Sequence, residues 1–238
     1  MNKILVLNGS PRGKNGNTHK LVDKFLEGIK EIDTKTVIEY VELKNKNIKN
    51  CIGCFSCWNR TPGKCVQKDD MDELLEKFIE ADIIIWATPL YHYTMTSILK
   101  KFVERTLPLN EPYIVKKGDV FGHPERYDIR KKKNILISNC GFPEYHNFQL
   151  LIDEFKKISK EQLNGSILCV EGELLSIKPL QNRIKWYLDG VKKAGKEFAV
   201  DGYIHEETLK LLKKPLIPIE EFIEMANLSW QVDEGNKL

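Results

Sequence analysis

The segment 8–18, Asn-Gly-Ser-Pro-Arg-Gly-Lys-Asn-Gly-Asn-Thr, brings more polar donors together than any other part of the chain. It follows the apolar run 4–7 and precedes a helical pattern. A strand, a glycine-rich loop and a helix in that order present backbone N–H groups and a positive dipole end to a phosphate. Further donors and positive charge come from Ser10, Arg12, Lys14, Asn17 and Thr18. We therefore predict a phosphorylated cofactor here, the alternative being an ordinary strand-to-helix turn.

Two familiar phosphate loops do not fit this segment. A P-loop needs a glycine five residues after Gly9, where Lys14 stands. The dinucleotide fingerprint G-x-G-x-x-G fails because Ser10 and Pro11 follow Gly9. Thr18 is also a candidate cap for the helix that follows.

A second group of residues able to do chemistry is the spaced set Cys51-x2-Cys54-x2-Cys57-x7-Cys65. Clustered cysteines in a chain without a visible signal peptide indicate metal or redox chemistry. Three cysteines at two-residue intervals can wrap one corner of a cluster and a fourth can close it, whereas zinc normally takes two separated C-x2-C pairs. The spacing favours a [4Fe–4S] cluster. The alternatives are free or paired thiols, in a structured loop of partly buried cysteines covering the cofactor.

The elements that must position these groups alternate between strands and helices. Apolar runs at 4–7, 37–41, 83–87, 135–137 and 167–170 predict five strands, and helical spacing of apolar residues fills the intervals. The second run is more mixed, as an edge strand should be. This pattern predicts an α/β three-layer sandwich around a parallel sheet of order 2-1-3-4-5. Ligands of such sheets bind at the carboxyl ends of the strands, so loops 8–18, 88–93 and 138–143 should surround one crevice.

The residues 7–12, with Gly16-Asn17-Thr18, resemble the phosphate loop of the NADPH-dependent FMN reductases, of which iron-sulfur flavoproteins are a branch. The turn 88–91 and the turn 139–144 also resemble loops of that family, which has a flavodoxin-like fold. The resemblance implies FMN, with NAD(P)H as co-substrate. The cofactor-binding residues that it implies are Ser10, Arg12, Asn17, Thr18, Thr88, Pro89, Leu90, Tyr91, His92, Cys140 and Gly141.

Hydride transfer from a nicotinamide to a flavin needs no general base from the protein, so we expect no catalytic residue in that sense. His92 could tune the site or be an exposed loop residue, and we expect Cys140 to be a small buried residue and not a reactive thiol.

The cysteine segment resembles the compact motif of iron-sulfur flavoproteins. That likeness implies a [4Fe–4S] cluster on Cys51, Cys54, Cys57 and Cys65, although the seven-residue last interval is long. In the family such a cluster often lies near the flavin of a partner subunit, so the likeness also implies a homodimer or homotetramer.

The predicted function is an FMN-dependent oxidoreductase. It would pass electrons from NAD(P)H or a reduced ferredoxin to a small acceptor such as a quinone, a flavin or another electrophile, with the cluster as a relay. The alternatives are an electron carrier that is not an enzyme and a thiol-based redox sensor. We expect the segment 107–133 to cover the flavin, which argues against a carrier.

Composition narrows the remaining choices. The 238 residues carry a net charge of only +3, which predicts no nucleic-acid or membrane partner. No apolar run is long enough to span a bilayer and the start leads straight into a strand, so we expect a cytoplasmic protein. We predict a flavodoxin-like domain at 1–202, containing a cysteine-rich loop at 51–65 and a surface excursion at 107–133. A helical extension at 203–238 should pack on this domain or on a partner, with Phe222 and Trp230 as candidate anchors. The basic run 130–133 should be solvated.

Overall fold

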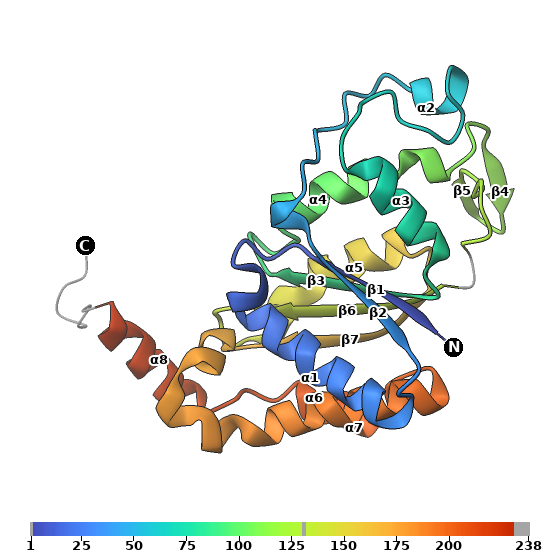
Figure 1. The fold of residues 1–238 in the computed structure, drawn as a ribbon. Coiled ribbons are helices and arrows are strands. Elements are labelled where there is room, and N and C mark those ends of the chain that lie inside the picture. The colour runs from blue at the N-terminus through green and yellow to red at the C-terminus, as the bar shows by residue number, and fades with distance from the viewer. Residues whose placement is uncertain (1, 130–131, 231–238) are drawn as a thin grey trace.

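The structure of the protein is a computed structural model that describes residues 2–129 and 132–230. Its centre is a five-stranded sheet of order β2-β1-β3-β6-β7 in which every neighbouring pair is parallel (Figure 1). The strands are β1 (Lys3–Asn8), β2 (Val37–Glu42), β3 (Ile83–Pro89), β6 (Lys133–Asn139) and β7 (Leu163–Cys169). Numbered within the sheet alone, this is the predicted order 2-1-3-4-5, so the prediction of the fold is confirmed.

Burial explains the order of the strands. The residues of β1 and β3 are almost all buried, because these strands lie inside the sheet and have helices on both faces. Ile4 pairs with Ile38 on one side and with Ile83 on the other. The strand β2 is half-exposed, as its mixed sequence predicted for an edge.

Helices cover both faces of this sheet. The α-helices are α1 (Asn17–Ile32), α2 (Ser56–Asn59), α3 (Met71–Glu80), α4 (Ser97–Glu104), α5 (Gln149–Ile158), α6 (Gln181–Asp201), α7 (Glu206–Leu212) and α8 (Ile219–Ser229). In Figure 1, α1, α6 and α7 lie below the sheet, and α3, α4 and α5 lie above it.

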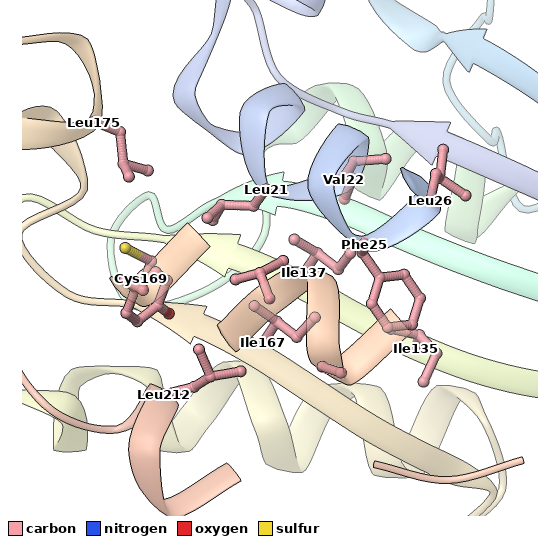
Figure 2. Close-up of a cluster of buried hydrophobic side chains, with 14 of the residues drawn as sticks. Leu21, Val22, Phe25, Leu26, Ile135, Ile137, Ile167, Cys169, Leu175 and Leu212 are labelled. Carbon is pink, nitrogen blue, oxygen red and sulfur yellow. The ribbon is translucent and has the colours of Figure 1, made fainter. Parts of the chain in front are cut away.

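The lower layer is built on a close approach of α1 and α6. Gly28 and Gly195 lie where a Cβ would overlap a backbone carbonyl of the other helix, so only glycine allows this distance. Figure 2 shows the apolar cluster between these helices and the sheet, where Phe25 of α1 lies near Ile135 and Ile167 of the strands. The cluster fixes the start of α1 relative to the carboxyl ends of the strands.

The upper layer is organised around Trp86 of β3. Its ring packs against Phe78, Phe102 and Phe155, which come from α3, α4 and α5. Its indole N–H donates to Asn134 Oδ1 at 2.9 Å, so the one polar atom of this buried ring is paired.

The excursion 107–133 contains a 3₁₀ turn at Leu107–Leu109 and an antiparallel hairpin, β4 (Val115–Lys117) and β5 (Val120–Gly122), which the sequence analysis did not predict. Two residues of the basic run, 130 and 131, lie outside the described residues. The expectation that the run is solvated is wrong for Lys132, which is 9% exposed. Its ammonium donates to the carbonyls of Ile79 and Ala81, where α3 ends.

The described part of the C-terminal extension packs on its own chain. Leu212, Leu216, Ile217 and Phe222 are buried in the cluster that holds α1 and α6. Trp230 is 77% exposed, so its expected role as an anchor on this domain is not seen, and residues 231–238 lie outside the described residues. Within the part of the chain that is described, no helix combines the length and apolar character that crossing a membrane requires.

Candidate functional site

A cleft opens where the loops after β1, β3, β6 and β7 meet. We call it the carboxyl-end cleft, and its lining residues are Ser10, Pro11, Arg12, Gly16, Asn17, Thr18, Pro89, Leu90, Tyr91, Asn139, Cys140, Gly141 and Glu173. Nine of the eleven residues predicted to bind a cofactor are among them. The exceptions are Thr88 and His92. Four lining residues are not among the eleven: Pro11, Gly16 and Asn139, which lie in the loops predicted to surround the crevice, and Glu173, which lies outside them.

The side chain of Asn8 holds the loop after β1, residues 8–18, in shape. Its Oδ1 accepts the Ser10 N–H at 2.8 Å, and its Nδ2 donates to the Tyr40 hydroxyl at 2.7 Å. His19 Nδ1 lies 2.9 Å from the same hydroxyl. The Ser10 hydroxyl accepts the Arg12 N–H at 3.3 Å. The loop is thus fixed to β2 and α1 by side chains that do not themselves line the cleft.

The helix α1 begins at the cleft without a side-chain cap. Gly16 is its N-cap residue and makes no side-chain hydrogen bond, so the expectation that Thr18 caps the helix is wrong. A Cβ on Gly16 would lie 2.7 Å from Ser10 Oγ and would fill the space beside this helix end. An uncapped N-terminus carries unpaired N–H groups and a positive dipole end, which together suit a phosphate.

Two hydrogen bonds join this helix end to the loops of β6 and β7. Thr18 Oγ1 donates to Asn139 Oδ1 at 2.6 Å, and Ser176 Oγ donates to Asn17 Oδ1 at 2.6 Å. The backbone N–H of Leu90 donates to the Asn139 carbonyl at 2.9 Å, which ties in the loop after β3. Asn139 is therefore the residue through which the three loops are linked.

Thr88 lies behind the cleft and is fully buried. Its Oγ1 accepts the N–H of Thr96, whose own hydroxyl donates to the Gly9 carbonyl at 2.7 Å. These contacts give Thr88 a supporting position behind the cleft, which it does not line.

The turn 91–94 projects outward from the end of the second loop. The backbones of Tyr91 and Thr94 hydrogen-bond to each other in both directions, at 3.0 and 3.1 Å. Between them, His92 and Tyr93 have φ of 46° and 67°, a left-handed conformation that costs non-glycine residues about 1–3 kcal/mol. His92 therefore lies at the tip of a tight exposed turn and does not line the cleft.

Cys140 is buried at the edge of the cleft, as expected. Its backbone N–H donates to the Cys169 carbonyl at 3.0 Å, and its thiol donates to the Phe142 carbonyl at 3.3 Å. Burial raises the pKa of Cys140 to about 11, so it is a neutral thiol at physiological pH.

The four clustered cysteines surround a small separate pocket, which we call the cysteine pocket. It is lined by Cys51, Cys54, Cys57 and Cys65 together with Ile52, Phe55, Gln67, Glu104, Arg105, Leu107 and Pro108. All four cysteines are free. Among the described residues, no three His, Cys, Asp or Glu side chains are already arranged as ligands around one point.

The cysteine pocket is not part of the carboxyl-end cleft. No residue of 51–65, and none of those described in 107–133, lines that cleft. The expectation that the excursion covers the flavin is therefore not supported, and neither is the alternative that the cysteine loop does so.

Comparison with known proteins agrees with this geometry. Residues 2–119, about half of the chain, match the family model described as NADPH-dependent FMN reductase, which confirms the predicted resemblance. An iron-sulfur flavoprotein of Archaeoglobus fulgidus is 39% identical over 106 residues, which are 44% of this chain and 46% of that protein. One of Methanosarcina thermophila is 36% identical over 118 residues, 50% of this chain and 59% of that one. The chain thus spans about half the length of the curated relatives that it matches.

A solved structure shares the fold over a longer stretch. The FMN-dependent NADH-azoreductase of Bacillus anthracis, in complex with FMN, superposes with a TM-score of 0.62 over 84% of this chain and 100% of its own. Its sequence is 18% identical, so it supports the flavodoxin-like fold alone.

Proposed function

We propose that the protein is an FMN-dependent oxidoreductase that takes electrons from NAD(P)H, or from a reduced ferredoxin, and passes them to a small acceptor. The acceptor classes are quinones, free flavins and other electrophiles. The observation that carries the proposal is the carboxyl-end cleft, which joins an uncapped helix N-terminus to apolar and aromatic residues at the switch point of the sheet.

The residues of the cleft fit the two ends of FMN. The start of α1 offers backbone N–H groups to the phosphate, Ser10 offers a hydroxyl and Arg12 a guanidinium, while the Thr18 hydroxyl is already bonded to Asn139. Leu90 and Tyr91 offer flat apolar contact to the ring. When bound, FMN can accept two electrons and release them one at a time. The chain's own part is to hold and orient the cofactor and to limit its contact with water.

Apo-protein titrated with FMN, followed by assays of NADH and NADPH oxidation with a quinone, tests this proposal. We expect stoichiometric uptake and turnover well above that of free FMN. Folded protein that takes up no FMN would contradict the proposal. Uptake without turnover from either nicotinamide or a reduced ferredoxin would favour an electron carrier. The carrier remains a second candidate because none of the described residues of 107–133 lines the cleft.

We also propose that the cysteine pocket binds a [4Fe–4S] cluster. Two observations support a fit: the donor set of four thiols lies around one pocket, and a buried cationic N–H beside them, Arg105 Nε, has no acceptor among the described residues. The bound cluster would supply a one-electron step between the flavin and a partner or acceptor.

Iron and sulfide analysis after anaerobic reconstitution tests the cluster. We expect about four irons per chain, lost in Cys57→Ser and kept in the control Cys169→Ser, because Cys169 is buried away from the pocket. Wild-type protein that binds no iron would contradict the cluster and favour a thiol redox switch.

A further inference from the structure

A buried ion pair lies next to the cysteine pocket. Arg105 Nη1 and Nη2 donate to the two carboxylate oxygens of Asp69 at 2.6 and 3.0 Å, and the two side chains are 1% and 0% exposed. Nη1 also donates to the Lys49 carbonyl at 2.8 Å. Such a two-pronged pair fixes the plane of the guanidinium. Burying two charges is costly, so a pair in this position calls for an explanation beyond stability.

Asp69 is held in place by two backbone N–H groups in addition to Arg105. Its Oδ2 accepts the Lys49 N–H at 2.9 Å and its Oδ1 accepts the Met71 N–H at 3.1 Å. Burial alone would raise the pKa of Asp69, but the hydrogen bonds from Arg105 and from these backbone groups outweigh it and lower the pKa. Asp69 is therefore a fixed carboxylate that orients Arg105.

One hydrogen-bond donor of Arg105 has no partner among the described residues. Its Nε–H is buried and has no acceptor among the described residues, while Arg105 lines the cysteine pocket with all four cysteines. An unpaired donor on a buried cation costs free energy, because it has lost its hydrogen bonds to water without gaining one in the protein. Its position beside thiols indicates that the missing acceptor is an anionic sulfur.

The surroundings strengthen any charge interaction at this point. Ile52, Phe55, Leu107 and Pro108 give the pocket apolar walls, and a low local dielectric increases the effect of a nearby charge. An arginine side chain stays protonated at physiological pH, so Arg105 is a permanent cation that its two bonds to Asp69 hold beside the cysteines.

We propose that Arg105 is a positioning residue for the iron-sulfur cluster: its Nε–H donates to the Cys65 sulfur, and its charge, oriented by Asp69, raises the cluster's reduction potential. This inference rests on the cluster proposed above. Reduction adds one negative charge to the cluster, and hydrogen bonds to the sulfurs together with a nearby cation stabilise the more negative state.

The test is the midpoint potential of the reconstituted cluster, measured by spectroelectrochemistry. The paired variant Arg105→Gln with Asp69→Asn removes both charges without leaving a buried carboxylate alone. We expect it to shift the one-electron equilibrium at least tenfold toward the oxidised cluster, which is about 59 mV. Arg105→Lys keeps the charge and loses the Nε–H, so we expect a smaller shift in the same direction.

The matched control is Arg126→Lys. Arg126 pairs with Glu111 at 3.0 Å and lies beside Gly63 of the same cysteine loop, but it does not line the pocket. We expect the reduction potential of the cluster in the Arg126→Lys variant to equal that in the wild type. FMN uptake and thermal unfolding report whether each variant is folded, and Arg105→Lys carries the test if the paired variant is not.

The outcomes separate the two proposals. If wild-type protein binds no iron, the cluster and this inference fall together. If it binds iron and the folded Arg105 variants keep the wild-type potential, this inference alone is overturned. A purely structural role would lower the unfolding temperature and leave the potential unchanged.

Discussion

Thr18 Oγ1 donates to Asn139 Oδ1 at 2.6 Å although 121 residues separate them in the chain. The bond joins the first turn of α1 to the end of β6 across the carboxyl-end cleft. Asn139 also accepts the Leu90 N–H on its backbone carbonyl, so the loops after β1 and β3 are both bonded to this residue at the end of β6. The proposed FMN site is thus assembled by contacts between loops and not within any one of them.

Replacing Thr18 by valine keeps the shape of the side chain and removes the donor. It removes a bond that holds the cleft in its shape, with a net contribution of about 0.5–1.5 kcal/mol, and we expect FMN to bind roughly 2- to 10-fold more weakly. Quenching of FMN fluorescence on titration of apo-protein measures the change. The control Thr106→Val removes a hydroxyl bonded to the Val103 carbonyl outside the cleft, and an equal loss there would refute the role of Thr18.

A methyl group at Gly16 should block the phosphate end of the cleft. The Cβ would lie 2.7 Å from Ser10 Oγ and next to the uncapped start of α1. We expect Gly16→Ala to weaken FMN binding at least tenfold, because the methyl group displaces Ser10 Oγ, whereas the backbone itself, with φ of −87°, suits alanine. Gly122→Ala adds a methyl group where nothing lies within 4 Å and is the control. Unchanged FMN affinity in Gly16→Ala would place the phosphate elsewhere.

The sheet could be predicted from the sequence because its strands are determined by burial. Runs such as 4–7 and 83–87 are apolar on both faces, which only an inner strand of a covered sheet requires. Strand order and helix alternation then place the loops at one end, so most of the cleft follows from the pattern alone.

The parts that could not be predicted depend on contacts between distant segments. The bond from Thr18 to Asn139 was not predicted, because it depends on β6 ending level with Pro89 of β3, a register that no local pattern reveals. Thr88 was expected to contact the cofactor. It precedes Pro89, which lines the cleft, and it accepts a hydrogen bond from Thr96 behind the cleft. Lys132 looked solvated as part of a basic run, yet it ends on the carbonyls at the end of α3.

Cys140 should be chemically inert although it lines the cleft. With a pKa of about 11, roughly one molecule in three thousand carries the thiolate at pH 7.5. We expect iodoacetamide to modify Cys140 far more slowly than the exposed Cys51 and Cys54 in cluster-free protein, as measured by peptide mass spectrometry. Denatured protein, in which all cysteines react, is the control.

The same reasoning predicts that Cys140→Ala keeps turnover within a few-fold of the wild type, because a neutral buried thiol is not needed for hydride transfer. A loss of a hundredfold or more, with FMN still bound, would show that the thiol takes part in the chemistry.

Glu171 gives a prediction about pH. Its carboxyl group is fully buried, Oε2 accepts the Ile217 N–H at 3.0 Å, and Oε1 has no partner among the described residues. Burial raises the pKa of Glu171 above its ordinary value of 4.5, against the smaller effect of hydrogen bonds from Ile217 and Leu216. The folded state therefore holds this proton more tightly than the unfolded state does.

The sign of the effect follows from linkage. Where the folded state binds more protons, the free energy of unfolding decreases as pH rises, so Glu171 destabilises the fold increasingly from about pH 4.5 up to its raised pKa. Glu171→Gln cannot ionise, so the stability of this variant relative to wild type should increase between pH 4.5 and 8. Urea unfolding at both pH values measures the difference. The exposed Glu220→Gln is the control and should show no such trend, and a Glu171→Gln difference that is constant with pH would mean that folding does not raise the pKa of Glu171.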